Sequence, residues 1–261
     1  MAHQTIPSDD RHLAVETDGD KGADSSILFV HGPGGDQKIW SQQLPLASDH
    51  RIVRLNLSGH GASDDVDADP GFETLLAYSA DLTSTLRTIE PTYLVGHSLG
   101  AAVILHTLAT TEIPIDGAVL TGAGVKLPVN AEILRLATEN FTELVAFLHA
   151  PDRLFYKISN SVSTPSEEAM RTTGKWVTQR DFLTCDAIDV SSESTEIAVP
   201  SLILAGEYDR MVPPTQQRRL ANTLSDSSFA LVPRSAHMPM LEQPDAFNRA
   251  VAVFIEQCRN G

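Results

Sequence analysis

Gly96-His97-Ser98-Leu99-Gly100 is the stretch of sequence that decides the fold of this chain. It follows a short apolar run at 92–95, which has the composition of a buried strand. It precedes an Ala/Leu-rich segment at 101–109, which has the length and composition of a helix. A strand that turns directly into a helix must pass through a tight corner. The sequence therefore predicts that Ser98 lies at such a corner in a strained backbone conformation.

The pattern Gly-x-Ser-x-Gly at a strand-to-helix corner is typical of a nucleophile elbow. An elbow of this kind lifts a serine hydroxyl to the top of a sheet and places it at the positive end of a helix. The pattern alone is a weak signal because glycine and serine are common residues. Its context strengthens the interpretation: three further segments each follow a predicted strand, and ligands of open α/β sheets bind beyond the carboxyl ends of the strands.

Composition narrows the possible classes of protein. The chain has 261 residues, of which 42% are hydrophobic, and a formal net charge of −15. This charge argues against nucleic acid and anionic membrane surfaces as partners. No apolar run is long enough for a transmembrane helix, no secretory signal is visible, and the two cysteines make no disulfide framework, so we expect a cytoplasmic protein. A soluble acidic surface explains the charge, and adaptation to high salt is the alternative.

Strand and helix patterns alternate along most of the chain. After a loose tail at 1–10, strands are expected at 11–17, 26–30, 51–57, 92–95, 117–120, 200–205 and 229–232. Repeated βα units predict an α/β fold with a mostly parallel central sheet and helices on both faces. The alternation of strands and helices stops at 126–190, where only helices are expected, at 131–138, 142–149, 166–178 and 181–188. We therefore expect a core made of 1–125 and 191–261, with 126–190 as a helical insertion.

A serine hydroxyl needs partners before it can attack a carbonyl group. An alcohol is a poor nucleophile at neutral pH, so Ser98 needs a base within hydrogen-bond reach, and that base needs an acid that orients it. His237 follows the last predicted strand, and we predict that it is the base. Asp209 follows the strand at 200–205 and is predicted to be the acid, because a carboxylate there can hold the far imidazole nitrogen. Glu207 is the rival candidate.

The segment His31-Gly32-Pro33-Gly34-Gly35, after the second predicted strand, is the candidate oxyanion loop. Glycines let backbone N–H groups approach a developing oxyanion closely. One N–H is predicted to come from Leu99, the residue after the nucleophile. Pro33 has no N–H, so we predict Gly34 as the second donor. His31 is expected to be a structural loop histidine outside the proton chemistry.

Taken together, these segments resemble the α/β-hydrolase superfamily over nearly the full length of the chain. The resemblance rests on the candidate oxyanion loop, Asn56-Leu57-Ser58-Gly59-His60-Gly61-Ala62-Ser63-Asp64, the elbow, Gly206-Glu207-Tyr208-Asp209 and Ala236-His237-Met238-Pro239-Met240-Leu241-Glu242-Gln243-Pro244. It implies the α/β-hydrolase fold with 126–190 as a helical cap inserted late in the sheet. Because residue 98 is serine, the dehalogenases and epoxide hydrolases of this fold, which use an aspartate nucleophile, are disfavoured.

The resemblance implies a serine hydrolase that needs no cofactor or metal and cleaves a carboxylic ester, thioester or lactone through an acyl-enzyme. A cap over the elbow would add apolar side chains to the wall of the substrate pocket, so we expect a small-molecule substrate with an apolar portion. His149, Arg153 and Arg180 are candidates to contact a substrate carboxylate or phosphate, and each also fits an ordinary surface position. The alternatives are C–C bond hydrolysis or cofactor-free perhydrolysis on the same triad, and a non-enzymatic ligand receptor that retains the fold.

Overall fold

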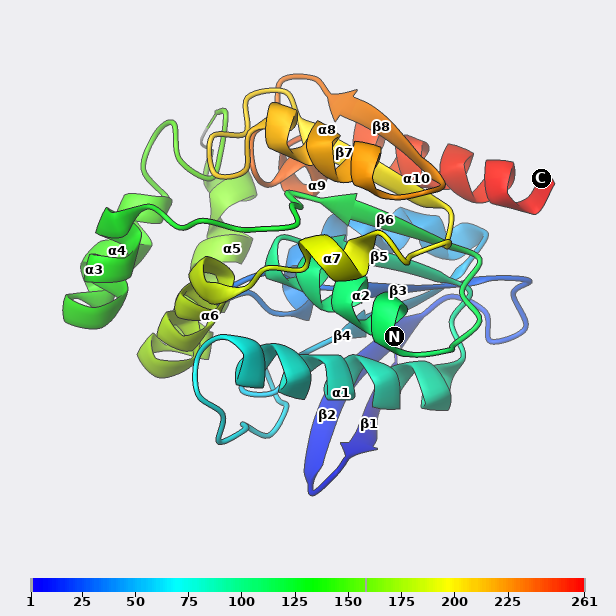
Figure 1. Cartoon of the computed structure of the whole chain (residues 1–261), viewed down its shortest axis with the longest axis horizontal. Helices are drawn as coiled ribbons and strands as arrows, with labels where there is room; N and C mark the ends of the chain where they lie inside the picture. Colours follow the sequence, from blue (N-terminus) through cyan, green and yellow to red (C-terminus); the bar gives the residue numbers. More distant parts are fainter. Residues whose placement is uncertain (1, 158, 261) are drawn as a thin grey trace.

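The computed structural model describes residues 2–157 and 159–260, and its centre is an eight-stranded sheet of order β1-β2-β4-β3-β5-β6-β7-β8 (Figure 1). The strands are β1 (Ala2–Ser8), β2 (Arg11–Asp18), β3 (Ser26–Val30), β4 (Arg51–Leu55), β5 (Tyr93–His97), β6 (Gly117–Thr121), β7 (Ser201–Gly206) and β8 (Ser227–Val232). Strands β3 to β8 run parallel, whereas β2 pairs antiparallel with both β1 and β4. The predicted α/β fold with a mostly parallel sheet is confirmed.

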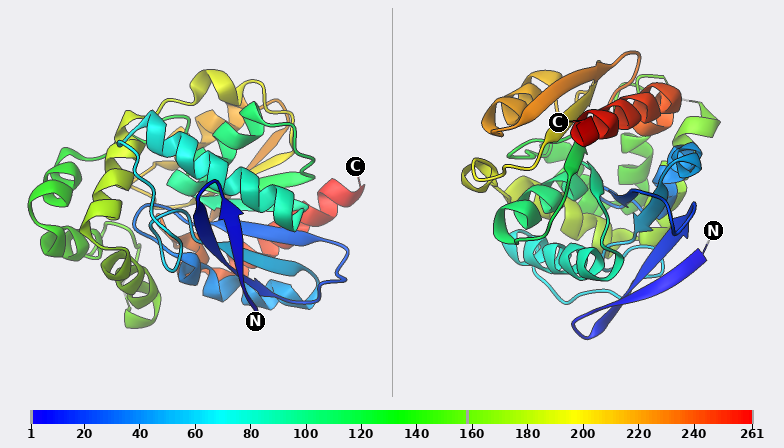
Figure 2. Two further views of the ribbon diagram at one scale, coloured as in Figure 1. Left: turned by 90° about the horizontal axis from the view of Figure 1, so that it is seen from below. Right: turned by 90° about the vertical axis from the view of Figure 1, so that its right-hand side faces the viewer.

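The prediction of a loose tail at 1–10 is wrong. Ala2–Ser8 forms the edge strand β1, which pairs with β2 along its whole length and projects as a hairpin (Figure 2). Only Ile6 and Ser8 of this strand are buried, and Ile6 packs beside Leu13 of β2. An edge strand with a single buried apolar side chain gives almost no alternating pattern, so the sequence did not reveal it.

Helices cover both faces of the sheet because its central strands alternate their apolar side chains between the two faces. Leu28 and Val30 of β3 pack on the side of α1 (Phe72–Ile89), α2 (Leu99–Thr110) and α8 (Pro214–Thr223). The opposite face holds Ile27 and Phe29, which pack with Trp40 of the 3₁₀ helix η1 (Gln37–Ser48) and with Phe247 of α10 (Pro244–Asn260). Burying side chains of this size contributes about 1.5–3 kcal/mol each, against the entropy of ordering the chain.

A group of helices connects β6 to β7. It comprises α3 (Ala131–Glu139), α4 (Phe141–Leu148), α5 (Asn160–Thr173), α6 (Lys175–Ala187) and the short α7 (Ser191–Ser194). Helices α3 to α6 pack on one another at one end of the sheet (Figures 1 and 2). The expected helices at 166–178 and 181–188 were misplaced. Gly174, with φ of 82°, separates α5 from α6, and a left-handed residue of this kind commonly ends a helix.

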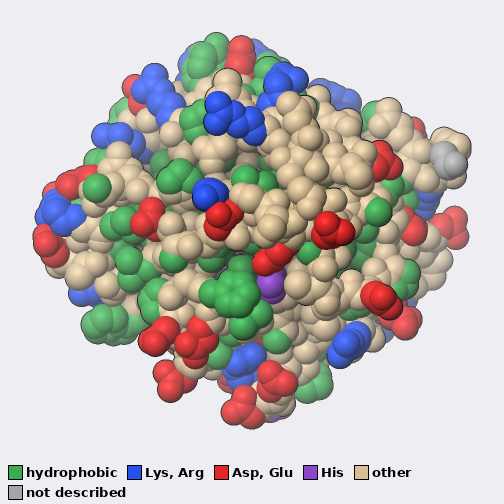
Figure 3. Space-filling view, viewed as in Figure 1, with side chains coloured by type: hydrophobic (Ala, Val, Ile, Leu, Met, Phe, Trp, Pro, Cys, Tyr) green, Lys and Arg blue, Asp and Glu red, His purple; other side chains and the backbone are tan. Residues whose placement is uncertain are grey.

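The surface of the molecule is acidic. On the face shown in Figure 3, Asp and Glu side chains are spread widely, and Lys and Arg form no continuous patch. This agrees with the formal net charge of −15. Among the helices formed by residues 2–157 and 159–260, none has the length and apolarity needed to cross a membrane.

Candidate active site

Ser98 lies at the corner between β5 and α2, as the elbow pattern predicts. Its φ is 52°, a left-handed value that is strained for a residue with a side chain. Gly100 makes the corner possible, because a Cβ at that position would collide with the carbonyl oxygen of His31. The chain therefore holds one serine in an unfavourable conformation next to the N-terminus of a buried helix.

Asp209 and His237 come together although they follow different strands. Asp209 lies beyond β7 and His237 lies beyond β8, and Asp209 Oδ2 is 2.9 Å from His237 Nδ1. Both side chains are buried. The other oxygen of Asp209 accepts the backbone N–H groups of Met211 and Val212, each at 2.9 Å. These bonds fix the direction in which the carboxylate faces the imidazole.

The protonation pattern of the His237 ring follows from its partner. An ionised carboxylate only accepts hydrogen bonds, so Nδ1 of His237 carries the hydrogen and Nε2 is left as a lone-pair base in the neutral ring. Gln217 of α8 adds a second donor to Asp209 Oδ2 at 3.0 Å. Sequence reasoning missed Gln217, because nothing in the pattern of α8 distinguishes this glutamine from a surface residue.

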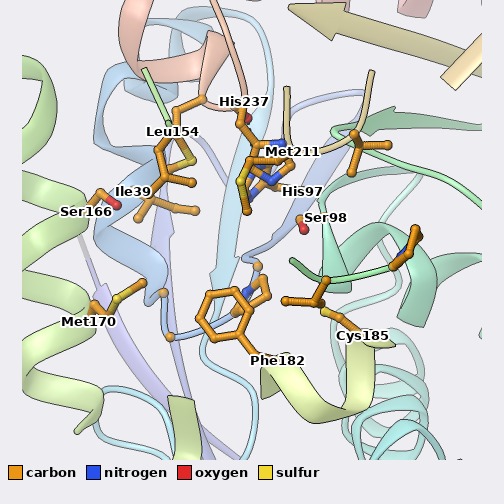
Figure 4. A pocket seen from close by; sticks show the side chains of 18 residues that line it. Ile39, His97, Ser98, Leu154, Ser166, Met170, Phe182, Cys185, Met211 and His237 are labelled. Atoms are coloured by element: carbon orange, nitrogen blue, oxygen red, sulfur yellow. Dashed lines mark hydrogen bonds between the residues drawn. The ribbon is translucent and has the colours of Figure 1, made fainter. Parts of the chain in front are cut away.

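Ser98 and His237 line the same cavity, which lies beyond the carboxyl ends of the strands (Figure 4). His97 lies between them in the figure, and its Nε2 donates to the carbonyl oxygen of His237 at 2.9 Å. Most of the remaining wall is apolar and comes from both the sheet loops and the helical segment: Pro33, Ile39, Val129, Leu154, Met170, Phe182, Met211, Val212 and Met238. The site is thus a mainly apolar cavity with a few polar atoms gathered at one place.

The two predicted oxyanion donors differ in their surroundings. Leu99 is the first residue of α2, so its N–H has no acceptor within the helix. The Gly34 N–H instead donates to Asp181 Oδ2 at 2.8 Å. Gly34 could therefore serve an oxyanion only if this bond opened. The Gly35 N–H closes a turn onto the carbonyl oxygen of Gly32 at 3.0 Å.

His31 has the structural surroundings that were expected for it. Its Nδ1 donates to the carbonyl oxygen of Gly32, and its Nε2 accepts the N–H of Leu57. Complete burial, with the nearby His60 adding to the effect, lowers the pKa of His31 to about 3. The neutral ring thus connects the candidate oxyanion loop to the segment after β4.

The three residues predicted as anion contacts do not line the cavity with Ser98. Arg180 donates to Asp65 Oδ1 at 2.7 Å and to the carbonyl oxygen of Val66, also at 2.7 Å. His149 Nε2 lies 3.1 Å from Ser166 Oγ, and Arg153 stacks over the ring of Phe147. No group of His, Cys, Asp or Glu suited to hold a metal occurs among the described residues.

Lowering the pH from 7.5 to 5.5 should destabilise the fold. Burial lowers the pKa of both His31 and His97, so below about pH 6.5 the unfolded chain binds protons that the folded chain does not. Each histidine then removes about 1.4 kcal/mol of unfolding free energy per pH unit. The raised pKa of His60 has the opposite effect on the free energy of unfolding, and it offsets the loss caused by one of these two histidines. Urea denaturation should show a net loss of at least about 1 kcal/mol, and equal stability at both pH values would contradict this.

Comparison with known proteins connects this geometry to a family. Residues 27–250 match the profile described as "Alpha/beta hydrolase family". The chain is 27% identical to a protein of Agrobacterium fabrum provisionally named a carbamate hydrolase, over 88% of this chain and 92% of that one. It is 21% identical to the 2-hydroxy-6-oxo-6-(2'-aminophenyl)hexa-2,4-dienoic acid hydrolase of Metapseudomonas resinovorans, over 90% of this chain and 86% of that one. A solved structure from Burkholderia cenocepacia, provisionally titled an aryl esterase, aligns with a TM-score of 0.86, 26% identity and complete coverage of both chains.

Proposed function

This chain belongs to the alpha/beta hydrolase family, and from that premise we propose that it hydrolyses a carboxylic ester, thioester or lactone through an acyl-enzyme on Ser98. His237 is the proposed base and Asp209 the acid that orients it. The observation that carries the proposal is the 2.9 Å hydrogen bond between Asp209 and His237 beside a cavity that Ser98 also lines. A nucleophile, a base and an orienting acid on three loops of one sheet edge are the parts that acyl transfer requires.

In the proposed reaction, His237 Nε2 takes the proton of Ser98 as Oγ attacks the carbonyl carbon. The charge that develops on the carbonyl oxygen is stabilised by the Leu99 N–H and by the positive end of α2. Asp209 stabilises the imidazolium, which then protonates the leaving alcohol, thiol or lactone oxygen as the bond to it breaks. A water molecule, deprotonated by His237, attacks the acyl-enzyme, and Ser98 recovers its proton when the acid leaves.

We propose that 126–190 acts as a cap that selects the substrate. Leu154, Met170 and Phe182 from this segment line the cavity together with Ile39 and Met211 of the core (Figure 4). Walls of this kind favour an apolar acyl or alcohol group, with orientation supplied by the few polar atoms near Ser98. The expected substrate is therefore a small molecule with an apolar portion next to the carbonyl that reacts.

A panel of p-nitrophenyl esters of graded acyl length, with a lactone and an acyl thioester, tests the proposal. We expect kcat/KM to rise with acyl length until the cavity is filled, because each buried CH₂ contributes about 0.8 kcal/mol, or roughly fourfold. A fluorophosphonate should label the wild-type protein on one serine. A folded protein that hydrolyses none of these compounds and takes up no label would exclude the proposed function.

Hydrolysis of a C–C bond on the same residues is the second candidate. It is favoured by the relative whose name describes a hydrolase of a 2-hydroxy-6-oxo dienoic acid. The two activities share the base and the acid, so product analysis must separate them. Incubation with a ring-fission dienone should leave its ultraviolet absorbance unchanged if the esters are the true substrate class, and should bleach it if C–C cleavage is the activity.

A further inference from the structure

A buried carboxylate joins the helical segment to the catalytic loops. Asp181 of α6 is fully buried. Its Oδ2 accepts the Gly34 N–H and lies 2.8 Å from His60 Nε2, while its Oδ1 accepts the Tyr78 hydroxyl at 2.7 Å. The three partners come from the loop after β3, the loop after β4 and helix α1. One side chain of the cap therefore connects three separate segments of the core.

His60 and Asp181 form an ion pair. His60 Nδ1 faces the carbonyl oxygen of Ser58 at 3.0 Å and Nε2 faces the carboxylate, so both ring nitrogens meet acceptors and both must carry hydrogen. Burial by itself would lower the pKa of His60, but the charge and hydrogen bond of Asp181 outweigh it and hold this pKa above its ordinary value. The carboxylate is thus neutralised by a cation 2.8 Å away.

The Gly34 N–H is the part of the oxyanion loop that Asp181 can hold. Pro33 has no N–H, and the Gly35 N–H is used inside the loop. Gly34 adopts a left-handed φ of 60°, and a Cβ there would lie 3.0 Å from Thr178 Oγ1 and 3.2 Å from Met170 Cγ. The peptide between Pro33 and Gly34 forms part of the cavity wall with Ser98, so its orientation shapes the space around the hydroxyl.

We propose that Asp181 is a positioning residue for the hydrolysis proposed above, on which this inference rests. Through the Gly34 N–H it fixes the Pro33–Gly34 peptide beside Ser98, and through His60 it keeps its own charge balanced. Misplacement of a wall peptide by about 1 Å can lower a catalytic rate about 100-fold without touching a reacting atom.

The test compares two substitutions on the same buried side of α6. Asp181→Asn replaces the charged acceptor of the Gly34 N–H with a neutral amide and ends the ion pair with His60. Thr184→Val removes a different buried bond between cap and core, in which Thr184 Oγ1 accepts the Gly71 N–H at 2.9 Å. Assayed on a p-nitrophenyl ester below their melting temperatures, Asp181→Asn should lose about 10- to 100-fold in kcat with KM within threefold. Thr184→Val should keep the wild-type kcat even where its melting temperature falls.

Two further measurements keep the test decisive. Imidazole ¹⁵N NMR at pH 7 should find His60 protonated in the wild type and neutral in Asp181→Asn, a readout that needs no turnover. If Asp181→Asn is too unstable to assay, His60→Gln removes the cation that balances the carboxylate holding the Gly34 N–H, and kcat should fall about tenfold.

The outcomes separate this inference from the proposed function. An active wild type with an unchanged or increased kcat in Asp181→Asn would overturn the positioning role alone. Equal losses of kcat in Asp181→Asn and Thr184→Val would reduce Asp181 to an ordinary packing contact. A wild type that is inactive on all esters would overturn the proposed function, and the positioning role would fall with it.

Discussion

Ser98→Ala should lower kcat for a short p-nitrophenyl ester by about 10⁵- to 10⁶-fold, because removal of the proposed nucleophile leaves only the weak catalysis that oxyanion stabilisation and binding provide. KM should change little, since the cavity wall stays in place. The substitution should also abolish fluorophosphonate labelling. Folding should be retained, because alanine removes one hydroxyl and fills the same corner.

Ser166→Ala is the matched control for this result. Ser166 lines the same cavity from α5, and its Oγ lies 3.1 Å from His149 Nε2, away from the pair formed by Asp209 and His237. Its kcat should stay within about threefold of the wild type, as expected for a serine that holds no reacting atom. A Ser98→Ala protein that kept more than about 1% of kcat, or a Ser166→Ala protein that lost labelling, would place the nucleophile elsewhere.

The sheet was predictable because its signals are local. A buried parallel strand reads as a short apolar run, and the loop that follows it must reach the carboxyl edge of the sheet, so the positions of Ser98, Asp209 and His237 in the chain already placed them near one another. Strand β1 was missed because an edge strand with one buried apolar residue shows no alternation of apolar and polar residues in the sequence. The break at Gly174 was missed because helical spacing continues across it.

Asp181 could not be found from the sequence. An acidic residue in a helical segment is most often solvated, and nothing local distinguishes this one from Asp186 on the same helix. Its contact with Gly34 joins residues 147 positions apart. The prediction that the Gly34 N–H is the second oxyanion donor rested on the residues of one loop, so it did not include an acceptor that comes from α6. Local patterns therefore predicted which loops contribute to the candidate site, whereas its supporting contacts depend on tertiary structure.

Asp209→Asn should lower kcat by about 10⁴-fold while leaving the fold intact. The N–H groups of Met211 and Val212 both point at Oδ1, whereas a single side-chain donor, Gln217 Nε2, points at Oδ2. The amide oxygen of the substituted side chain should therefore stay at the Oδ1 position, where it meets two donors, and its NH₂ should replace Oδ2. An NH₂ group facing Nδ1 of His237 makes that nitrogen an acceptor and moves the ring hydrogen to Nε2, where it can no longer take the serine proton. Steady-state kinetics on a p-nitrophenyl ester measures the loss.

The control for this substitution is Glu207→Gln, which removes the same charge from the same loop. Glu207 is exposed, and its Oε2 accepts the Arg234 N–H at 3.0 Å. Because its carboxylate bonds to the backbone of another loop while Asp209 already holds Nδ1 of His237, Glu207→Gln should keep kcat within about threefold. The reverse result, with Glu207→Gln inactive and Asp209→Asn active, would make Glu207 the acid and would leave the bond between Asp209 and His237 without a catalytic role.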